Sequence, residues 1–229
     1  MIDVLAHNNW KRPVYFAITV PDDNYMGLGD FLYNEGFAYR LLPLKKAQLD
    51  SAAEKPELTN SDQMYTNLMT KFKWGNMKNA NYLDPESLRM SYTMINHFNI
   101  LAENLYKEGR NEEARKLLLK CMEVVPDKNH SLNFTIRKFY MADLLYKLKE
   151  PAKANELTLN TADYIEDQLN YMAAIAKTKE NLNSREIQLG VYVMSELVKL
   201  AEKNGQAAVL KKLQDRMKVI ESKFMASER

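Results

Sequence analysis

The chain has 229 residues, of which 46% are hydrophobic and 27% are charged, and its net charge is +2 at pH 7. These values are typical of a globular protein, and the charge balance argues against a nucleic-acid-binding surface, which needs an excess of lysine and arginine. No run of apolar residues approaches the ~20 that a membrane-spanning helix needs. A single cysteine excludes an internal disulfide bond.

The first 92 residues differ in composition from the rest of the chain, since they hold four of the seven glycines, five of the seven prolines and both tryptophans. Residues 13–20 and 36–44 are rich in β-branched and aromatic side chains and predict two strands. Residues 31–35 predict a helical turn. We therefore expect a small α+β segment over residues 1–92, called the lead-in below, and a helical domain over residues 93–229.

The helical part is organised around a repeated pair of helices. In residues 95–126, apolar side chains recur at helical spacing and Gly109 interrupts them where a tight turn needs a residue without Cβ. Seven of these residues recur identically 40 positions later, and a weaker third pair has Gly205 in its turn. This pattern is typical of tetratricopeptide repeats, whose usual period is about 34 residues. We predict a mainly α fold, a tetratricopeptide-like α-solenoid of about three helix pairs, and a break near residues 92–94 in the helix over residues 87–107.

The sequence offers no arrangement of residues for catalysis or for metal binding. His7, His97 and His130 have no cysteine, histidine or carboxylate at ligand spacing, so we expect no metal site. Cys121 occupies a small-residue position inside a helix pair, which predicts a buried structural thiol. No phosphate-binding loop and no nucleophile elbow is present. We therefore expect neither enzymatic activity nor a cofactor.

Aromatic and cationic residues of the lead-in are one candidate binding site. Aromatic faces stack on the apolar faces of sugars, and arginine donates hydrogen bonds to polar groups. The alternative is that the rings form the core of the lead-in, because large rings dominate small cores. The candidates for binding a sugar or a peptide are Trp10, Arg12, Tyr39, Arg40 and Trp74.

A second candidate site is the concave face of the repeats, which the first helix of each pair lines. Two sets of an acidic residue, a tyrosine and a lysine lie one repeat apart and would hold an extended peptide. The alternative is an ordinary solvated helix face. The residues predicted to line this face are Asn96, Asn99, Glu103, Tyr106, Lys107, Phe139, Asp143, Tyr146 and Lys147.

Motifs of the lead-in carry a resemblance to a known family. They include Asn8-Asn9-Trp10, Arg12-Pro13, Glu35-Gly36-Phe37 and the run from Lys71 through Trp74 to Asn76. The chain resembles the C-terminal part of a multi-spanning membrane protein family of unknown function that is common in Bacteroidetes. That family is similar to GT-C glycosyltransferases of the protein O-mannosyltransferase type.

The resemblance implies a non-catalytic domain at the periplasmic face of the inner membrane, because the catalytic carboxylate of the family belongs to its membrane region. Such a domain would recognise a polypeptide or glycan acceptor, or organise a complex with its own membrane-spanning region. Asp50-Ser51-Ala52 resembles an O-glycosylation acceptor motif, which agrees with export. The alternative is a free-standing cytoplasmic adaptor that binds a partner peptide in the concave groove. Neither role involves nucleic acid.

Overall fold

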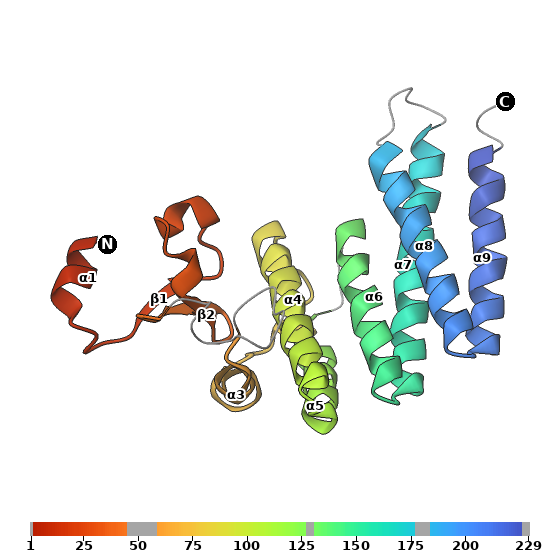
Figure 1. Cartoon of the computed structure of the whole chain (residues 1–229). Coiled ribbons are helices and arrows are strands. Elements are labelled where there is room, and N and C mark those ends of the chain that lie inside the picture. The colour runs from red at the N-terminus through yellow and green to blue at the C-terminus, as the bar shows by residue number, and fades with distance from the viewer. Residues whose placement is uncertain (1, 45–58, 127–130, 177–183, 226–229) are drawn as a thin grey trace.

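A computed structural model of the chain describes residues 2–44, 59–126, 131–176 and 184–225. The small sheet of the lead-in lies at one end, and helices then follow one another in chain order toward the C-terminus (Figure 1). This arrangement confirms the predicted mainly α, α-solenoid-like fold with an α+β lead-in. The motif at residues 50–52 lies outside the described residues. None of the helices in the described ranges is long and apolar enough to cross a membrane.

The lead-in begins with a short helix and a three-stranded antiparallel sheet of order β1-β3-β2. Phe16, Tyr25, Leu32 and Leu41 form a small core of their own beneath this sheet. The elements are α1 (Ile2–Asn8), β1 (Val14–Ala17), the 3-10 turns η1 (Asp22–Tyr25) and η2 (Gly29–Phe31), β2 (Leu32–Asn34) and β3 (Ala38–Leu41).

The helical turn predicted over residues 31–35 is wrong, because most of this segment is strand β2. Leu32 and Asn34 are buried and Tyr33 between them is half-buried, which is the two-residue alternation of a strand. The tight connection to β3 depends on Gly36, whose φ of +127° is open to glycine and strained for other residues. Gly36 alone was not enough to identify the hairpin of β2 and β3 from the sequence.

Two short helical elements join the lead-in to the repeats. Helix α3 (Ser61–Thr66) continues directly into the π-helical turn η3 (Asn67–Lys71), and the 3-10 turn η4 (Met77–Asn79) follows. Asn60 caps α3, since its side chain accepts a hydrogen bond from the backbone N–H of Gln63 at 3.1 Å. Met64 and Leu68 are fully buried and belong to the core of the first helix pair.

Three helical hairpins form the body of the protein, and α4 begins where Asp84 caps it with Pro85 at its first position. The predicted break near residues 92–94 is wrong, because α4 is continuous there and contains no glycine or proline after its first residue. The predicted boundary between residues 92 and 93 stays a prediction, and α4 runs across it. The hairpins are α4 (Pro85–Lys107) with α5 (Asn111–Val124), α6 (Leu132–Lys147) with α7 (Pro151–Ala176), and α8 (Ser184–Lys203) with α9 (Ala207–Met225).

The three hairpin turns share one hydrogen-bonding pattern. In the first, the N–H of Gly109 donates to Tyr106 O at 3.0 Å and the N–H of Arg110 donates to Leu105 O at 2.8 Å. The same two bonds recur in the second and third turns. The residue at the Gly109 position has positive φ each time, and it is Lys149 in the second turn and Gly205 in the third. This is the αL helix ending that usually selects glycine.

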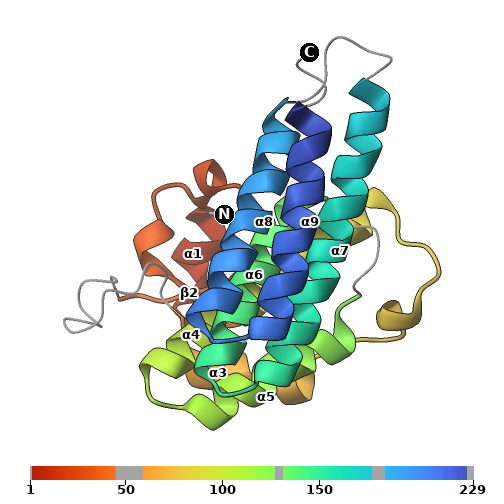
Figure 2. The ribbon, with the colours of Figure 1, turned by 90° about the vertical axis from the view of Figure 1, so that its right-hand side faces the viewer.

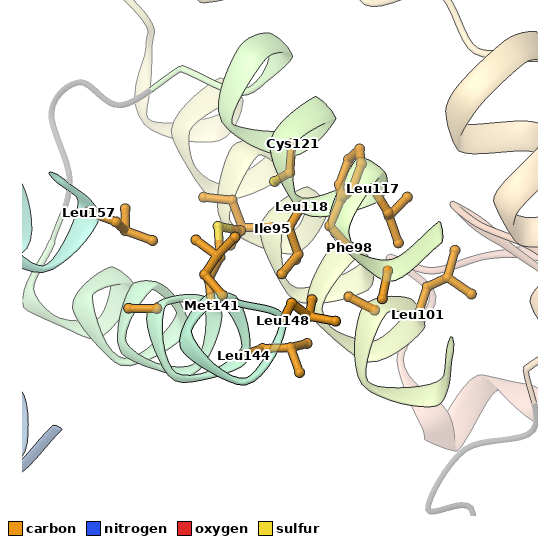
Figure 3. Close-up of a cluster of buried hydrophobic side chains, with 14 of the residues drawn as sticks. Ile95, Phe98, Leu101, Leu117, Leu118, Cys121, Met141, Leu144, Leu148 and Leu157 are labelled. Atoms are coloured by element: carbon orange, nitrogen blue, oxygen red, sulfur yellow. The ribbon is translucent and has the colours of Figure 1, made fainter. Parts of the chain in front are cut away.

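Two hydrophobic clusters fill the body, and the second hairpin contributes to both. The first cluster joins α4 and α5 to residues such as Met141, Leu144 and Leu157 of the second hairpin (Figure 3). The second cluster joins the remainder of that hairpin to α8 and α9, which run alongside α7 (Figure 2). Phe139 of α6 packs against both clusters.

Candidate functional site

An open groove with a volume of about 490 Å³ lies between α4 and α6. Seven of the nine residues predicted on the concave face line it, so residues of the two repeats lie together there. The remaining lining residues come from the same two helices. The predicted members are Asn96, Asn99, Glu103, Tyr106, Lys107, Asp143 and Lys147, and the others are Ile100, Arg137, Tyr140 and Leu144.

Ion pairs neutralise both carboxylates of the groove. Lys107 Nζ lies 2.8 Å from Glu103, and Lys147 Nζ lies 2.6 Å from Asp143. Lys203 of the next hairpin also reaches Asp143, at 3.5 Å. Such partly exposed pairs stabilise the fold by less than about 1 kcal/mol each. Their larger effect is on the charge of the groove, which is net positive because its cations outnumber its carboxylates.

Lys203 was missed by sequence reasoning, although a signal was present. Lys107, Lys147 and Lys203 are the last residues of α4, α6 and α8. The first helix of the third hairpin therefore ends in a lysine, as the first helices of the other two hairpins do. The third hairpin does not follow the second at the 40-residue spacing that relates the first two, so the equivalence of Lys203 to Lys147 is not apparent from the sequence.

A polar cluster occupies the other end of the groove. The side-chain amide of Asn99 donates to Arg137 O at 2.9 Å, while its Oδ1 is buried and has no hydrogen-bond partner in the described part of the chain. Arg137 in turn donates from Nε to Tyr92 OH at 3.2 Å, and its guanidinium lies 5.4 Å from the centre of that ring. Arg137 was missed because the corresponding position of the first repeat is His97. A buried acceptor without a donor favours a ligand that brings an N–H group.

Two residues predicted in the groove lie elsewhere. Phe139 packs into the hydrophobic clusters, and its neighbour Tyr140 takes the exposed position with 53% of its surface accessible. Tyr146 is buried and donates its hydroxyl to Asn155 Oδ1 at 2.6 Å, whereas the corresponding Tyr106 lines the groove. Identical residues one repeat apart therefore differ in exposure, because the neighbouring helices differ.

The aromatic candidates of the lead-in are divided between two cores. Tyr39 packs edge-on against Tyr25 at 6.1 Å between ring centres, within the core of the sheet. Trp74 packs against Phe72 and against Phe98 of α4, at 6.4 Å and 5.4 Å. These two rings fit the alternative that the sequence left open, which is a structural role in the core.

Arg40 belongs to a partly buried polar cluster on the sheet. Its guanidinium lies 3.5 Å from Glu35, whose side chain is only 6% exposed, and the Tyr15 hydroxyl donates to the same carboxylate at 2.9 Å. Burial, followed by the bond to Glu35, raises the pKa of Tyr15. Glu35 was missed by sequence reasoning, because nothing in the pattern marks its carboxylate as buried.

The remaining two candidates, Trp10 and Arg12, lie in an exposed turn after α1. Trp10 is 55% exposed and has a φ of +56°. The side chain of Asn8 holds the turn closed, since its amide donates to Arg12 O at 2.7 Å and its Oδ1 accepts from the Arg12 N–H at 3.3 Å. This turn displays an indole and a guanidinium to the solvent.

Two kinds of reactive group, a metal centre and a nucleophilic thiol, can be assessed in the described residues. No group of three or more histidine, cysteine or carboxylate side chains that could hold a metal ion occurs in the ranges the structure describes. Cys121 is buried, and burial raises the pKa of its thiol. A buried thiol with a raised pKa is a poor nucleophile.

Comparison with known proteins gives one family match. Residues 1–65 match the family described as TMEM260-associated domain 2. The match covers the sheet and most of α3 and stops before the hairpins, so it supports the predicted likeness to a domain associated with a membrane protein for this part of the chain. A search of the curated proteins and a search of the solved structures found no match.

Proposed function

We propose that the chain is a non-catalytic C-terminal domain of a membrane glycosyltransferase-like protein and that it recognises the polypeptide acceptor. In this proposal it lies at the periplasmic face of the inner membrane, in a family common in Bacteroidetes, and its helical hairpins are tetratricopeptide-like repeats. Its partners are the acceptor and its own membrane-spanning region.

The observation that carries this proposal is the family match of residues 1–65. The description of that family ties the lead-in to TMEM260, an O-mannosyltransferase-like membrane protein. A transferase that modifies polypeptides must hold an extended segment near its membrane region. The groove between α4 and α6 supplies a surface of that kind directly beside the lead-in.

Fractionation of native cells with an antibody against this chain tests the membrane assignment. We expect a band larger than the chain itself in the membrane fraction, protected from protease until the outer membrane is opened. A band of the size of the chain in the soluble cytoplasm would overturn the proposal.

Site-specific photocrosslinking tests acceptor recognition. A photoreactive phenylalanine at Tyr140, in the groove, should capture exported polypeptides from a periplasmic extract. The matched control is the same substitution at Tyr171 of α7, which is 64% exposed and does not line the groove. Equal capture at both positions would mean that the groove is not the recognition surface.

A free-standing adaptor that binds a partner peptide in the groove is the second candidate. The observation that favours it is the groove itself, because no described residue donates to Asn99 Oδ1, and exposed Tyr106 and Tyr140 flank the ion pairs. An extended peptide has backbone N–H groups to satisfy the amide and side chains to cover the rings.

Charge reversal in the groove tests this second function with a peptide captured at Tyr140. The double variant Glu103→Lys, Asp143→Lys should weaken binding about tenfold or more, because it breaks both ion pairs and reverses their carboxylates. The double variant Asp215→Lys, Glu221→Lys on α9 makes the same change in charge away from the groove. Unchanged affinity in the groove variant would exclude this surface.

A further inference from the structure

A second cavity, of about 320 Å³, lies beside the contact between the first and second hairpins and is separate from the groove. Its walls come from the end of α5, from α7 and from the face of α6 that is turned away from the groove. Helix α7 packs on both α8 and α9, whereas α5 packs on α4, α6, η3 and η4. The described residues therefore leave a space between the second helices of hairpins one and two.

The floor of this pocket is apolar. Ile95 of α4, Cys121 of α5, Met141 of α6 and Leu157 of α7 line it, and each is 5% exposed or less. Figure 3 shows Leu157 facing Ile95 and Met141 across the space. Its volume is at the lower end of the range for small-molecule sites, which suits a single short chain.

The carboxylates at its rim are already neutralised. Glu123 is paired with Lys120 at 3.2 Å, and Glu156 is paired with Lys153 at 2.8 Å, in each case along its own helix. The rim therefore adds little net negative charge to the pocket.

Lys78 gives the pocket a positive charge, and the partners of its ammonium in the described part of the chain are two neutral carbonyl groups. Its ammonium donates to Met122 O at 2.9 Å and to Val125 O at 3.0 Å, at the C-terminal end of α5. An ammonium has three N–H donors, so among residues 2–44, 59–126, 131–176 and 184–225 the third has no acceptor and can serve a ligand. Lys138, which is 5% exposed, places a second lysine in the wall.

We propose that this pocket binds a small amphiphilic anion, with a single alkyl chain against Ile95, Met141 and Leu157 and a carboxylate or phosphate at Lys78. This inference is independent of the proposed function, because the groove and the pocket are lined by different residues of α6. The alkyl chain covers apolar surface, and the head group accepts the third Lys78 N–H as a charge-assisted hydrogen bond.

The test is a titration of the whole chain, labelled with ¹³C at its methionine methyl groups, with octyl phosphate and with octanoate below their micelle concentrations. Met122 and Met141 line the pocket and report on it. We expect saturable shifts of these two methyl groups with both anions. Octyl glucoside, with the same chain and a neutral head group, should bind at least tenfold more weakly, which corresponds to the loss of one charge-assisted hydrogen bond.

Two variants separate pocket binding from general detergent binding. Asn160→Trp places a ring at the exposed rim and should abolish the shifts without disturbing the floor. Lys78→Gln should weaken both anions about tenfold while leaving octyl glucoside unchanged. Equal binding of all three compounds, persistence of the shifts in Asn160→Trp, or no saturable shift in the parent chain would each overturn the proposal. If Lys78→Gln does not fold, Asn160→Trp and the neutral ligand still decide the question.

Discussion

The Asn34 side-chain amide donates a hydrogen bond to His97 Nδ1 across 2.9 Å, which joins the sheet of the lead-in to helix α4. The amide orientation is fixed because Asn34 Oδ1 accepts the N–H of Gly36 at 2.9 Å, so Nδ2 is the atom that faces the imidazole. His97 Nδ1 must then be an acceptor, and the ring carries its proton on Nε2. The imidazole is 4% exposed and is neutral in the folded protein.

This relationship predicts a loss of stability in mild acid. Burial lowers the pKa of His97 from 6.5 to about 4, so between these pH values the unfolded chain binds a proton that the folded chain does not. The free energy of unfolding should therefore fall as the pH drops below 6.5, by roughly 3 kcal/mol at pH 4 from this residue alone. Urea unfolding at pH 7.5 and pH 4.5 measures the change.

Carboxylates also titrate in this range, so the comparison is between variants. His97→Gln keeps an acceptor for Asn34 without a titrating group and should flatten the pH dependence. His7→Gln removes an exposed histidine of α1 and should leave the pH dependence of the free energy of unfolding unchanged. The prediction fails if both variants follow the parent chain.

A glycine in place of Lys149 should stabilise the turn of the second hairpin. Lys149 holds the position that Gly109 and Gly205 hold in the other turns, with a φ of +62°. A side chain in this conformation costs about 1 kcal/mol relative to glycine. We expect Lys149→Gly to stabilise the protein by roughly 0.5–1 kcal/mol and Gly109→Ala to destabilise it by a similar amount. Thermal unfolding of the two variants should shift in opposite directions, and a shift in the same direction would contradict a common turn geometry.

Gly36→Ala should be more damaging than an alanine at an open turn. A Cβ at position 36 would lie 3.1 Å from the ring of Phe72, and the φ of +127° is strained for any side chain. We expect a loss of about 2 kcal/mol or more in the free energy of unfolding. Gly27→Ala is the matched control, since a Cβ there would meet nothing within 4 Å at a φ of +76°. Equal losses would show that the contact with Phe72 does not matter.

Cys121 should be unreactive in the folded protein. It is buried between α4 and α5, and burial raises the pKa of its thiol, so very little thiolate is exposed to a reagent at pH 8. Labelling with a chromogenic disulfide should require urea. The variant Ser222→Cys, at an exposed position of α9, should react at once under the same conditions, and rapid labelling of the parent chain would mean that the first hairpin opens readily.

Helical periodicity predicted the body of the protein well. The six long helices depend on spacing and on turn residues, which are local properties of the sequence, and α4 to α9 occur where these properties place them. The wrong predictions concern tertiary context. Strand β2 is three residues long and exists because β3 pairs with it, and no local pattern marks so short a strand.

The same distinction applies to the candidate site. Glu103, Lys107, Asp143 and Lys147 could be placed in one groove because the repeat puts equivalent positions on one face. Tyr146 could not be distinguished from Tyr106, since its burial depends on Asn155 of the facing helix. Trp74 was a binding candidate by composition, but its contact with Phe98 requires the packing of the lead-in on α4.

The packing of Phe139 against both hydrophobic clusters has a consequence for the thermal unfolding of the hairpins. Because Phe139 packs against both hydrophobic clusters, and Leu200 of α8 belongs to the first, loss of order in one cluster should destabilise the other. The hairpins are thus coupled as neighbouring units of a one-dimensional array, each stabilised largely by contact with the next. Heat should therefore unfold the three hairpins in a single calorimetric transition whose van't Hoff and calorimetric enthalpies agree, rather than in separate transitions for the first and the third hairpin.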